Sequence, residues 1–437
     1  MSAPAETDAL QASGIATRVE ALGYRSLRYI EQDLDAFHVL VGPNASGKST
    51  FLDVLAFLGD VVKAGAGAAV EGDSRLGVPH RAPDGRHLSW LREGARIELA
   101  VEFRVPPARL VHLRNGTDKR CRYEIALDVS GPLRIAAESL WLKPPTKIQP
   151  SQRDLFPSIQ QPPANLVRLL GSHAPEGWRR VLWRGEDPTN VTFSSETGNW
   201  KSPFRIAQDK AALASLPEDE NKFPVATWFR NALSVGVQRI ALSAEELRRP
   251  CPPGRTREFL PDGSNMPLVV HALEKDHPEV LESWIAHVRE ALPDLQSVTT
   301  HEREEDRHRY VVLHYANGLK APSWLASDGT LRLLALTLLA YVPGLSGTYL
   351  IEEPENGIHP RAVETVFQSL SSVYSAQVLL ATHSPVVLSI ASLDQVLCFA
   401  RAADGATDVV PGPMHPRLKD WKGDVDLGSL LASGVLS

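Results

Sequence analysis

The sequence has few cysteines and no long apolar run. Its three cysteines, Cys121, Cys251 and Cys398, are odd in number, far apart and without C-x-x-C spacing, which argues against a disulfide framework or a zinc site. No apolar run approaches the roughly 20 residues that span a bilayer, and the N-terminal residues lack the basic and apolar regions of a signal peptide. We therefore expect reduced thiols and a cytoplasmic protein with no membrane partner.

An excess of positive charge is also missing. The formal net charge is −6 at pH 7, so the composition gives no support for a nucleic-acid binder, although it leaves nucleic acid open as a partner of a local basic groove. Hydrophobic residues make up 43% of the 437 residues and charged residues 22%, which is enough apolar material for a full core. The length allows one large domain with insertions, or several smaller domains.

The sequence does contain a glycine-rich segment that fits a phosphate-binding loop. Residues 41–50 read VGPNASGKST and match G-x-x-x-x-G-K-[ST], between an apolar stretch (37–41) that predicts a buried strand and an apolar-faced stretch (49–63) that predicts a helix. Small residues let successive backbone N–H groups point at one phosphate, and the positive end of the helix would face the same anion. We predict nucleotide binding by Gly42, Pro43, Asn44, Ala45, Ser46, Gly47, Lys48, Ser49 and Thr50.

The pattern of the chain predicts four regions. Residues 1–14 are small and polar, which predicts a disordered tail. For residues 15–142 we predict a lobe that contains the phosphate loop and an antiparallel sheet, whose strands are expected at 95–105, 122–129 and 133–142. Residues 143–257 are broken by proline pairs and predict an inserted subdomain. Its interleaved tryptophans and arginines fit either a stacking platform for nucleic acid or, as we favour, an apolar cluster covered by basic side chains. Residues 258–437 predict a second lobe.

Three stretches of the second lobe carry further chemistry. Residues 348–355 (TYLIEEPE) predict an apolar strand that ends in carboxylates, of which Glu352 would hold magnesium and Glu353 would orient the attacking water. Residues 378–385 (VLLATHSP) predict another buried strand, after which His383 could donate a hydrogen bond to a γ-phosphate. Ser327 and Gly329 precede an apolar helix and predict a second anion site, which two chains arranged head to tail could supply to each other.

Together these motifs resemble the ATP-binding-cassette heads of the SMC, RecF and OLD group, and most closely the compact bacterial predicted AAA-family ATPases of that group. The resemblance implies an α/β fold, namely a P-loop ABC-type ATPase head with an antiparallel β subdomain and an inserted mixed or helical subdomain. It also implies that ATP and magnesium are the cofactors. Each role is carried over to the matching residue of this chain: Lys48 contacts the β- and γ-phosphates, Ser49 and Glu352 bind magnesium, Glu353 is the catalytic base, His383 is the switch histidine, Asn356 and Gly357 lie in the D-loop, and Ser327 with Gly329 forms the signature that acts in trans.

The sequence departs from the family pattern at two of these motifs. Glu352 stands where much of the family has aspartate, so a longer side chain would hold the metal and turnover would be slow. The signature reads Ala-Ser-Asp-Gly-Thr at 326–330, which argues against a transporter subunit. The glutamine loop has no assignment in this sequence.

The resemblance implies a regulatory ATPase. OLD-type nucleases carry a Toprim nuclease domain after the ATPase, but 54 residues follow His383 (437 − 383), which predicts that any nuclease or toxin is a separate partner protein. We expect a homodimer, or a higher homo-oligomer, that closes around ATP and magnesium and gates that effector in phage defence or DNA maintenance. The alternative is a slow nucleotide-held scaffold that sequesters a toxin or nuclease.

Overall fold

The computed structural model describes residues 15–111, 113, 119–146, 153–167, 174–185, 187–418 and 427–432. The expected disordered tail (1–14) lies outside the described residues. The chain divides into two compact units: unit 1 consists of Met1–Val237, Leu393–Lys422 and Val435–Ser437, and unit 2 of Gln238–Ser392 and Gly423–Gly434. Among the described residues, no helix combines the length and the apolar character that crossing a membrane requires.

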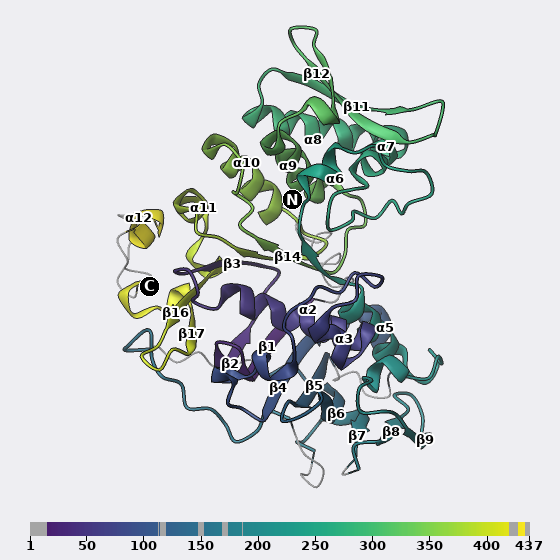
Figure 1. The fold of residues 1–437 in the computed structure, drawn as a ribbon, viewed down its shortest axis with the longest axis vertical. Coiled ribbons are helices and arrows are strands. Elements are labelled where there is room, and N and C mark those ends of the chain that lie inside the picture. The colour runs from purple at the N-terminus through teal and green to yellow at the C-terminus, as the bar shows by residue number, and fades with distance from the viewer. Residues whose placement is uncertain are drawn as a thin grey trace. The chain divides into compact units, whose positions relative to one another are not determined.

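Unit 1 is built on an eight-stranded antiparallel sheet. Its strands follow the order β2-β1-β4-β5-β6-β7-β8-β9 (Figure 1). The strands expected at 95–105, 122–129 and 133–142 are confirmed as β4, β5 and β6. The strand bounds are β1 (Ala16–Tyr24), β2 (Leu27–Asp33), β4 (Arg96–Arg104), β5 (Arg120–Asp128), β6 (Arg134–Lys143), β7 (Arg179–Arg184), β8 (Asn190–Ser194) and β9 (Lys201–Arg205).

Helices cover one face of this sheet. Because side chains alternate along a strand, each strand sends every second residue to this face, and Val19, Val101, Tyr123 and Leu140 form one paired, fully buried row across four strands. The helices packed against the sheet are α2 (Lys48–Ala64), α3 (Ala66–Glu71) and α5 (Pro224–Ser234), and α4 (Pro107–Leu110) packs on α5. Burial of this apolar face holds α2 on the sheet.

The opposite face of the same strands carries a buried network of charged side chains. Arg122 donates hydrogen bonds to Glu20, Glu102 and Glu124, and the Lys143 ammonium lies 2.6 Å from the Glu102 carboxylate. Burial alone would raise the pKa of Glu102, but Lys143 and Arg122 outweigh it and hold that pKa below its ordinary value. The network therefore pairs its charges internally and ties β1, β4, β5 and β6 together.

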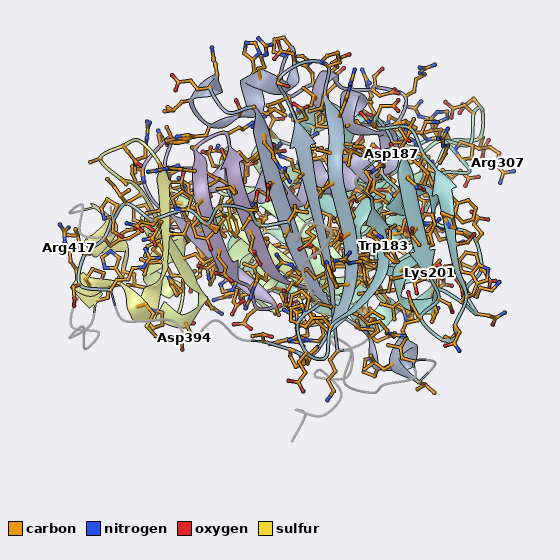
Figure 2. All side chains as sticks on the ribbon, turned by 90° about the horizontal axis from the view of Figure 1, so that it is seen from below. Trp183, Asp187, Lys201, Arg307, Asp394 and Arg417 are labelled. Atoms are coloured by element: carbon orange, nitrogen blue, oxygen red, sulfur yellow. The ribbon has the colours of Figure 1, made fainter. Side chains whose placement is uncertain are left out.

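Strands β7, β8 and β9 come from the expected insertion and extend the same sheet from β6. Their basic side chains lie over tryptophan rings. The Arg180 guanidinium is 4.2 Å from the centre of the Trp141 ring, and the Lys201 ammonium is 4.6 Å from the centre of the Trp183 ring. Figure 2 labels Trp183 and Lys201 on these strands. This is the arrangement expected of basic side chains that cover an apolar cluster. The domain boundaries at 143 and 257 stay a prediction.

Unit 1 also contains a small group of strands beside the start of α2. Strand β3 (Phe37–Val41) is paired in parallel with β16 (Val396–Arg401), which is paired in antiparallel fashion with β17 (Thr407–Pro411). The strand expected at 37–41 and the helix expected at 49–63 are thus confirmed as β3 and α2. Strands from the two ends of the sequence therefore meet where the phosphate loop begins.

Unit 2 combines parallel strands, helices and a three-stranded antiparallel sheet. Strands β10 (Val237–Ile240), β14 (Thr348–Glu352) and β15 (Gln377–Ala381) lie side by side in this order, and β14 and β15 are parallel. Helices α7 and α8 pack on the antiparallel sheet, and α8 and α9 on α10 (Figure 1). The remaining bounds are α6 (Ala244–Arg248), α7 (Met266–Asp276), α8 (Pro278–Ala291), β11 (Leu295–Glu302), β12 (Arg309–Tyr315), β13 (Lys320–Pro322), α9 (Asp328–Leu338), α10 (Pro360–Ser371), α11 (Pro385–Ile390) and α12 (Leu427–Ala432).

Candidate active site

The phosphate loop joins β3 to α2 in unit 1, and its shape depends on Gly47. This residue has φ 102°, in the left-handed region, and a Cβ atom added to it would collide with the side chain of Thr407 in β17. A residue with a side chain would meet both backbone strain and this collision. The loop therefore needs glycine here, because the backbone turns tightly against a neighbouring strand.

Two polar side chains of the loop are buried. The Lys48 ammonium donates hydrogen bonds to the backbone oxygens of Gly42 (2.8 Å) and Pro43 (3.0 Å), so its charge is held inside the loop. The Ser46 hydroxyl is fully buried and has no hydrogen-bond partner among the described residues. A buried cation at a helix N-terminus beside an unused hydroxyl fits an anionic ligand, and these residues therefore fit a nucleotide phosphate.

The remaining loop residues differ in exposure. Pro43, Asn44, Ala45 and Ser49 are exposed, Thr50 is half-buried, and Gly42 is buried. Ala45 also has a left-handed backbone, with φ 60°. Successive turns of this kind make a loop concave toward its N–H groups. Of the nine residues predicted to bind nucleotide, Gly42 to Gly47 form the loop, and Lys48, Ser49 and Thr50 form the first turn of α2.

A network of buried polar side chains, which no sequence pattern predicted, anchors α2 one turn after Lys48. Asp53 accepts hydrogen bonds from the Tyr24 hydroxyl (2.6 Å) and from Arg81 Nε (2.9 Å), and both Asp53 and Arg81 are buried. Burial raises the pKa of Tyr24 well above its ordinary value, and the charge of Asp53 raises it further. The network fixes the helix that carries the phosphate loop to β1 and to residue 81.

The predicted carboxylates of unit 2 follow β14. Glu352 is half-buried and forms an ion pair with Arg239 of β10. Glu353 has φ 47°, its N–H donates to the oxygen of Ala381 (2.8 Å), and its carboxylate accepts a hydrogen bond from the Asn356 side chain. Glu352 is thus neutralised by an arginine, whereas Glu353 is held by an uncharged amide in a turned backbone. The two carboxylates therefore lie in different environments, and their roles as metal ligand and catalytic base stay predictions.

His383 lies in the turn between β15 and α11. The turn is held by Glu355, whose Oε1 atom accepts hydrogen bonds from the Thr382 hydroxyl (2.6 Å) and the His383 N–H (3.1 Å). The hydroxyl of Ser384 accepts a hydrogen bond from the N–H of Val387 (3.4 Å) and caps α11. Since β14 and β15 are adjacent parallel strands, Glu352, Glu353 and His383 follow the same edge of the sheet.

The predicted signature residues lie at the start of α9. The Ser327 hydroxyl accepts a hydrogen bond from the N–H of Thr330 (3.1 Å) and caps the helix, and Asp328 forms an ion pair with Arg248. A Cβ atom added to Gly329 would lie 2.5 Å from the backbone oxygen of Gly357, in the loop after β14. The structure therefore brings the signature and the predicted D-loop together within unit 2.

Known proteins match the chain in sequence and in fold. Residues 37–162 and 182–389 match the model of a family described as "AAA domain, putative AbiEii toxin, Type IV TA system". The chain belongs to this AAA-domain family. A search of the curated proteins finds no match.

Solved structures match this AAA-domain protein in fold. The structure titled "Crystal structure of the SmcHead bound to the C-winged helix domain of ScpA" matches with a TM-score of 0.52 at 13% identity, over 91% of this chain and 97% of that chain. A second match is an Smc head domain with an extended coiled coil, bound to the C-terminal domain of ScpA and derived from Pyrococcus furiosus (TM-score 0.49, 12% identity, 97% of this chain and 98% of that chain). The first of these matches shows that the AAA-domain protein shares the α/β fold of an Smc head.

Proposed function

We propose that this AAA-domain protein binds ATP with magnesium and hydrolyses it. The observation that carries the proposal is the phosphate loop, where Lys48 is buried, the Ser46 hydroxyl is buried with no hydrogen-bond partner in the described part of the chain, and Gly47 admits no side chain. A buried ammonium is costly unless an anion or several acceptors compensate its charge. A nucleotide phosphate would supply that anion and use the hydroxyl as well.

The roles proposed for single residues follow their predicted chemistry. Lys48 and the backbone N–H groups of 42–50 bind the phosphates, and Ser49 with Glu352 holds magnesium, which neutralises phosphate charge when bound. Glu353 accepts a proton from the attacking water, supported by the Asn356 hydrogen bond that orients its carboxylate. His383 donates a hydrogen bond to the γ-phosphate and so reports its presence.

We further propose that two copies of the chain close around ATP. Ser327 is exposed at the start of α9, where its hydroxyl and the helix N-terminus can receive a phosphate of the other copy's nucleotide. The close approach of Gly329 to Gly357 supports closure around ATP, because a shift of the signature would displace the loop that follows Glu353. Larger homo-oligomers are compatible with the same contacts.

The partner in this proposal is a separate effector protein. The matching family is described with a toxin and a type IV toxin–antitoxin system, and the first matching head structure is bound to ScpA. We propose that the partner of this chain is a separate toxin or nuclease, gated by the ATP state of the dimer in phage defence or DNA maintenance; the descriptions support this only by naming a toxin–antitoxin system and a head bound to another protein. A scaffold that sequesters the same partner, with slow turnover, is the competing outcome.

Nucleotide binding is tested with Lys48→Ala, for which calorimetry should detect no ATP binding. The matched control is Lys63→Ala, which removes an exposed lysine from the last turn of the same helix and should leave the affinity unchanged. Unchanged ATP affinity in Lys48→Ala would refute the phosphate-loop assignment.

Dimerisation is tested by light scattering on Glu353→Gln with and without ATP and magnesium. We expect the mass to double with nucleotide, and Ser327→Arg should prevent this while leaving ATP binding intact. A mixture of Ser327→Arg and Lys48→Ala should recover at most one composite site. Full activity of that mixture would exclude a signature that acts in trans, and an ATP-independent mass with substoichiometric turnover would favour the scaffold.

A further inference from the structure

Glu355 connects the loop after β14 to the turn after β15. Its Oε1 atom accepts two hydrogen bonds, from the Thr382 hydroxyl (2.6 Å) and from the backbone N–H of His383 (3.1 Å). Its Oε2 atom is buried and has no hydrogen-bond partner among the described residues. Both hydrogen bonds made by this carboxylate therefore go to the turn that presents His383.

The direction of these hydrogen bonds is fixed by Ser384. The N–H of Ser384 donates to the Thr382 hydroxyl (2.9 Å), so the hydroxyl acts as an acceptor there and directs its own hydrogen to Glu355. Glu355 Oε1 thus receives two donors, which is the bonding expected of an ionised carboxylate. Thr382 is fully buried, so water does not compete for its hydroxyl.

The strands do not need Glu355 to stay together. Strands β14 and β15 are already paired along their whole length, from Thr348 and Gln377 to Glu352 and Ala381. Beyond the last pair, the N–H of Glu353 donates to the oxygen of Ala381. The carboxylate of Glu355 acts after this point, where the backbone leaves the sheet, and so orders the two loops relative to each other.

We propose that Glu355 is a positioning residue for ATP hydrolysis. It holds the turn of Thr382–Ser384 so that His383 is presented in register with Glu353, while Asn356, the next residue, holds the Glu353 carboxylate. Residues 355 and 356 of one loop thus orient the base and the histidine at once. The inference rests on the proposed ATPase function and adds a group that does not itself touch the nucleotide.

The kinetic test uses two pairs of variants. Glu355→Ala removes the acceptor and Glu355→Gln keeps one, whereas Thr382→Val removes the hydroxyl and Thr382→Ser keeps it. Loss of a hydrogen bond to a charged group corresponds to about a 10- to 100-fold effect on a rate. We expect kcat to fall by about this factor in Glu355→Ala and Thr382→Val, and ATP affinity to change by less than about threefold. The double variant should be no slower than Glu355→Ala, because both changes remove the same bond.

A second measurement does not depend on turnover. In nucleotide-free protein with carbon-13-labelled histidine, the His383 ring signal should shift or broaden in Glu355→Ala and Thr382→Val and stay unchanged in Thr382→Ser. An unchanged signal, a normal kcat, or equal losses of kcat and affinity in both disruptive variants would overturn the proposal. An inactive wild-type protein that binds no ATP would refute the proposed function instead, and the ring signal would still decide whether Glu355 positions the turn.

Discussion

Replacing Arg239 with glutamine is expected to strengthen magnesium binding in the presence of ATP. The guanidinium of Arg239 forms an ion pair with Glu352, the carboxylate proposed to hold the metal. Magnesium and Arg239 are both cations, so the metal must compete with the arginine for the same carboxylate. Without the arginine, the cation of this pair no longer competes with the metal for Glu352. Loss of the ion pair destabilises the metal-free state more than the metal-bound state, so the metal binds more tightly.

The size of the effect follows from the exposure of the pair. Two unit charges about 4 Å apart attract each other by about 1 kcal/mol in water and by about 4 kcal/mol at the effective dielectric of a protein surface. Measured exposed pairs contribute about 0.2–1 kcal/mol. The side chain of Arg239 is 46% exposed and that of Glu352 is 24% exposed, so solvent screens most of the attraction. We therefore expect about 0.5–1.4 kcal/mol, which is about a two- to tenfold gain in metal affinity.

The assay is calorimetry of ATP binding at several free magnesium concentrations and constant ionic strength, in the Glu353→Gln background that does not turn over. Arg239→Lys keeps the charge and should lie between the glutamine variant and the wild type. Arg257→Gln is the matched control, since it removes an arginine of unit 2 that pairs with Asp276. An unchanged or weaker magnesium dependence in Arg239→Gln would refute the competition.

Three further predictions concern stability. Alanine at Gly329 should destabilise unit 2 by about 1–3 kcal/mol in urea unfolding, because its Cβ atom would lie 2.5 Å from the Gly357 oxygen; a gain in stability, as at an ordinary helix glycine, would show that this contact is absent. Asp53→Asn should cost about 3 kcal/mol in the same assay, since Arg81 loses a buried partner and keeps Asp60; a loss under about 1 kcal/mol would contradict the buried pair. Burial, with the charge of Arg417, lowers the pKa of His415 to about 4, whereas the unfolded value is near 6.5. The stability contributed by the neutral ring is therefore complete above pH 6.5 and is lost as the pH falls toward 4. His415→Phe should lessen the decline of the melting temperature across that window, and an unaltered pH profile would count against a buried neutral His415.

The phosphate loop and its flanking elements could be predicted because their signals are local. A short apolar run before residue 42 and a helical period after residue 48 enclose a known loop pattern, and both elements formed as expected. For the same reason, the sequence predicted correctly that the carboxylates follow one strand, β14, and that His383 follows another, β15. Local sequence carries such signals because each depends on neighbours within one turn or one strand.

The partners of these residues could not be predicted, because they are distant in sequence. Arg239 lies 113 residues before Glu352, and Asp53 is bonded by Tyr24 and Arg81 from separate segments. Strands β7 to β9 have only five or six residues each and β9 contains Pro203, so their alternation is a weaker signal than that of the nine-residue β4. Which buried polar groups meet is decided by tertiary packing, and a single sequence carries little information about it.

The contact between Gly47 and Thr407 has a consequence for how the protein is made. The phosphate loop is complete only when β16 has paired with β3 and β17 has brought Thr407 against Gly47, 360 residues later in the chain (407 − 47). A nascent chain from which only the first lobe has emerged lacks Thr407, the residue that packs against Gly47 in the complete loop. We therefore expect the proposed nucleotide binding to need residues up to Thr407, and a chain that ends before β17 to bind ATP more weakly.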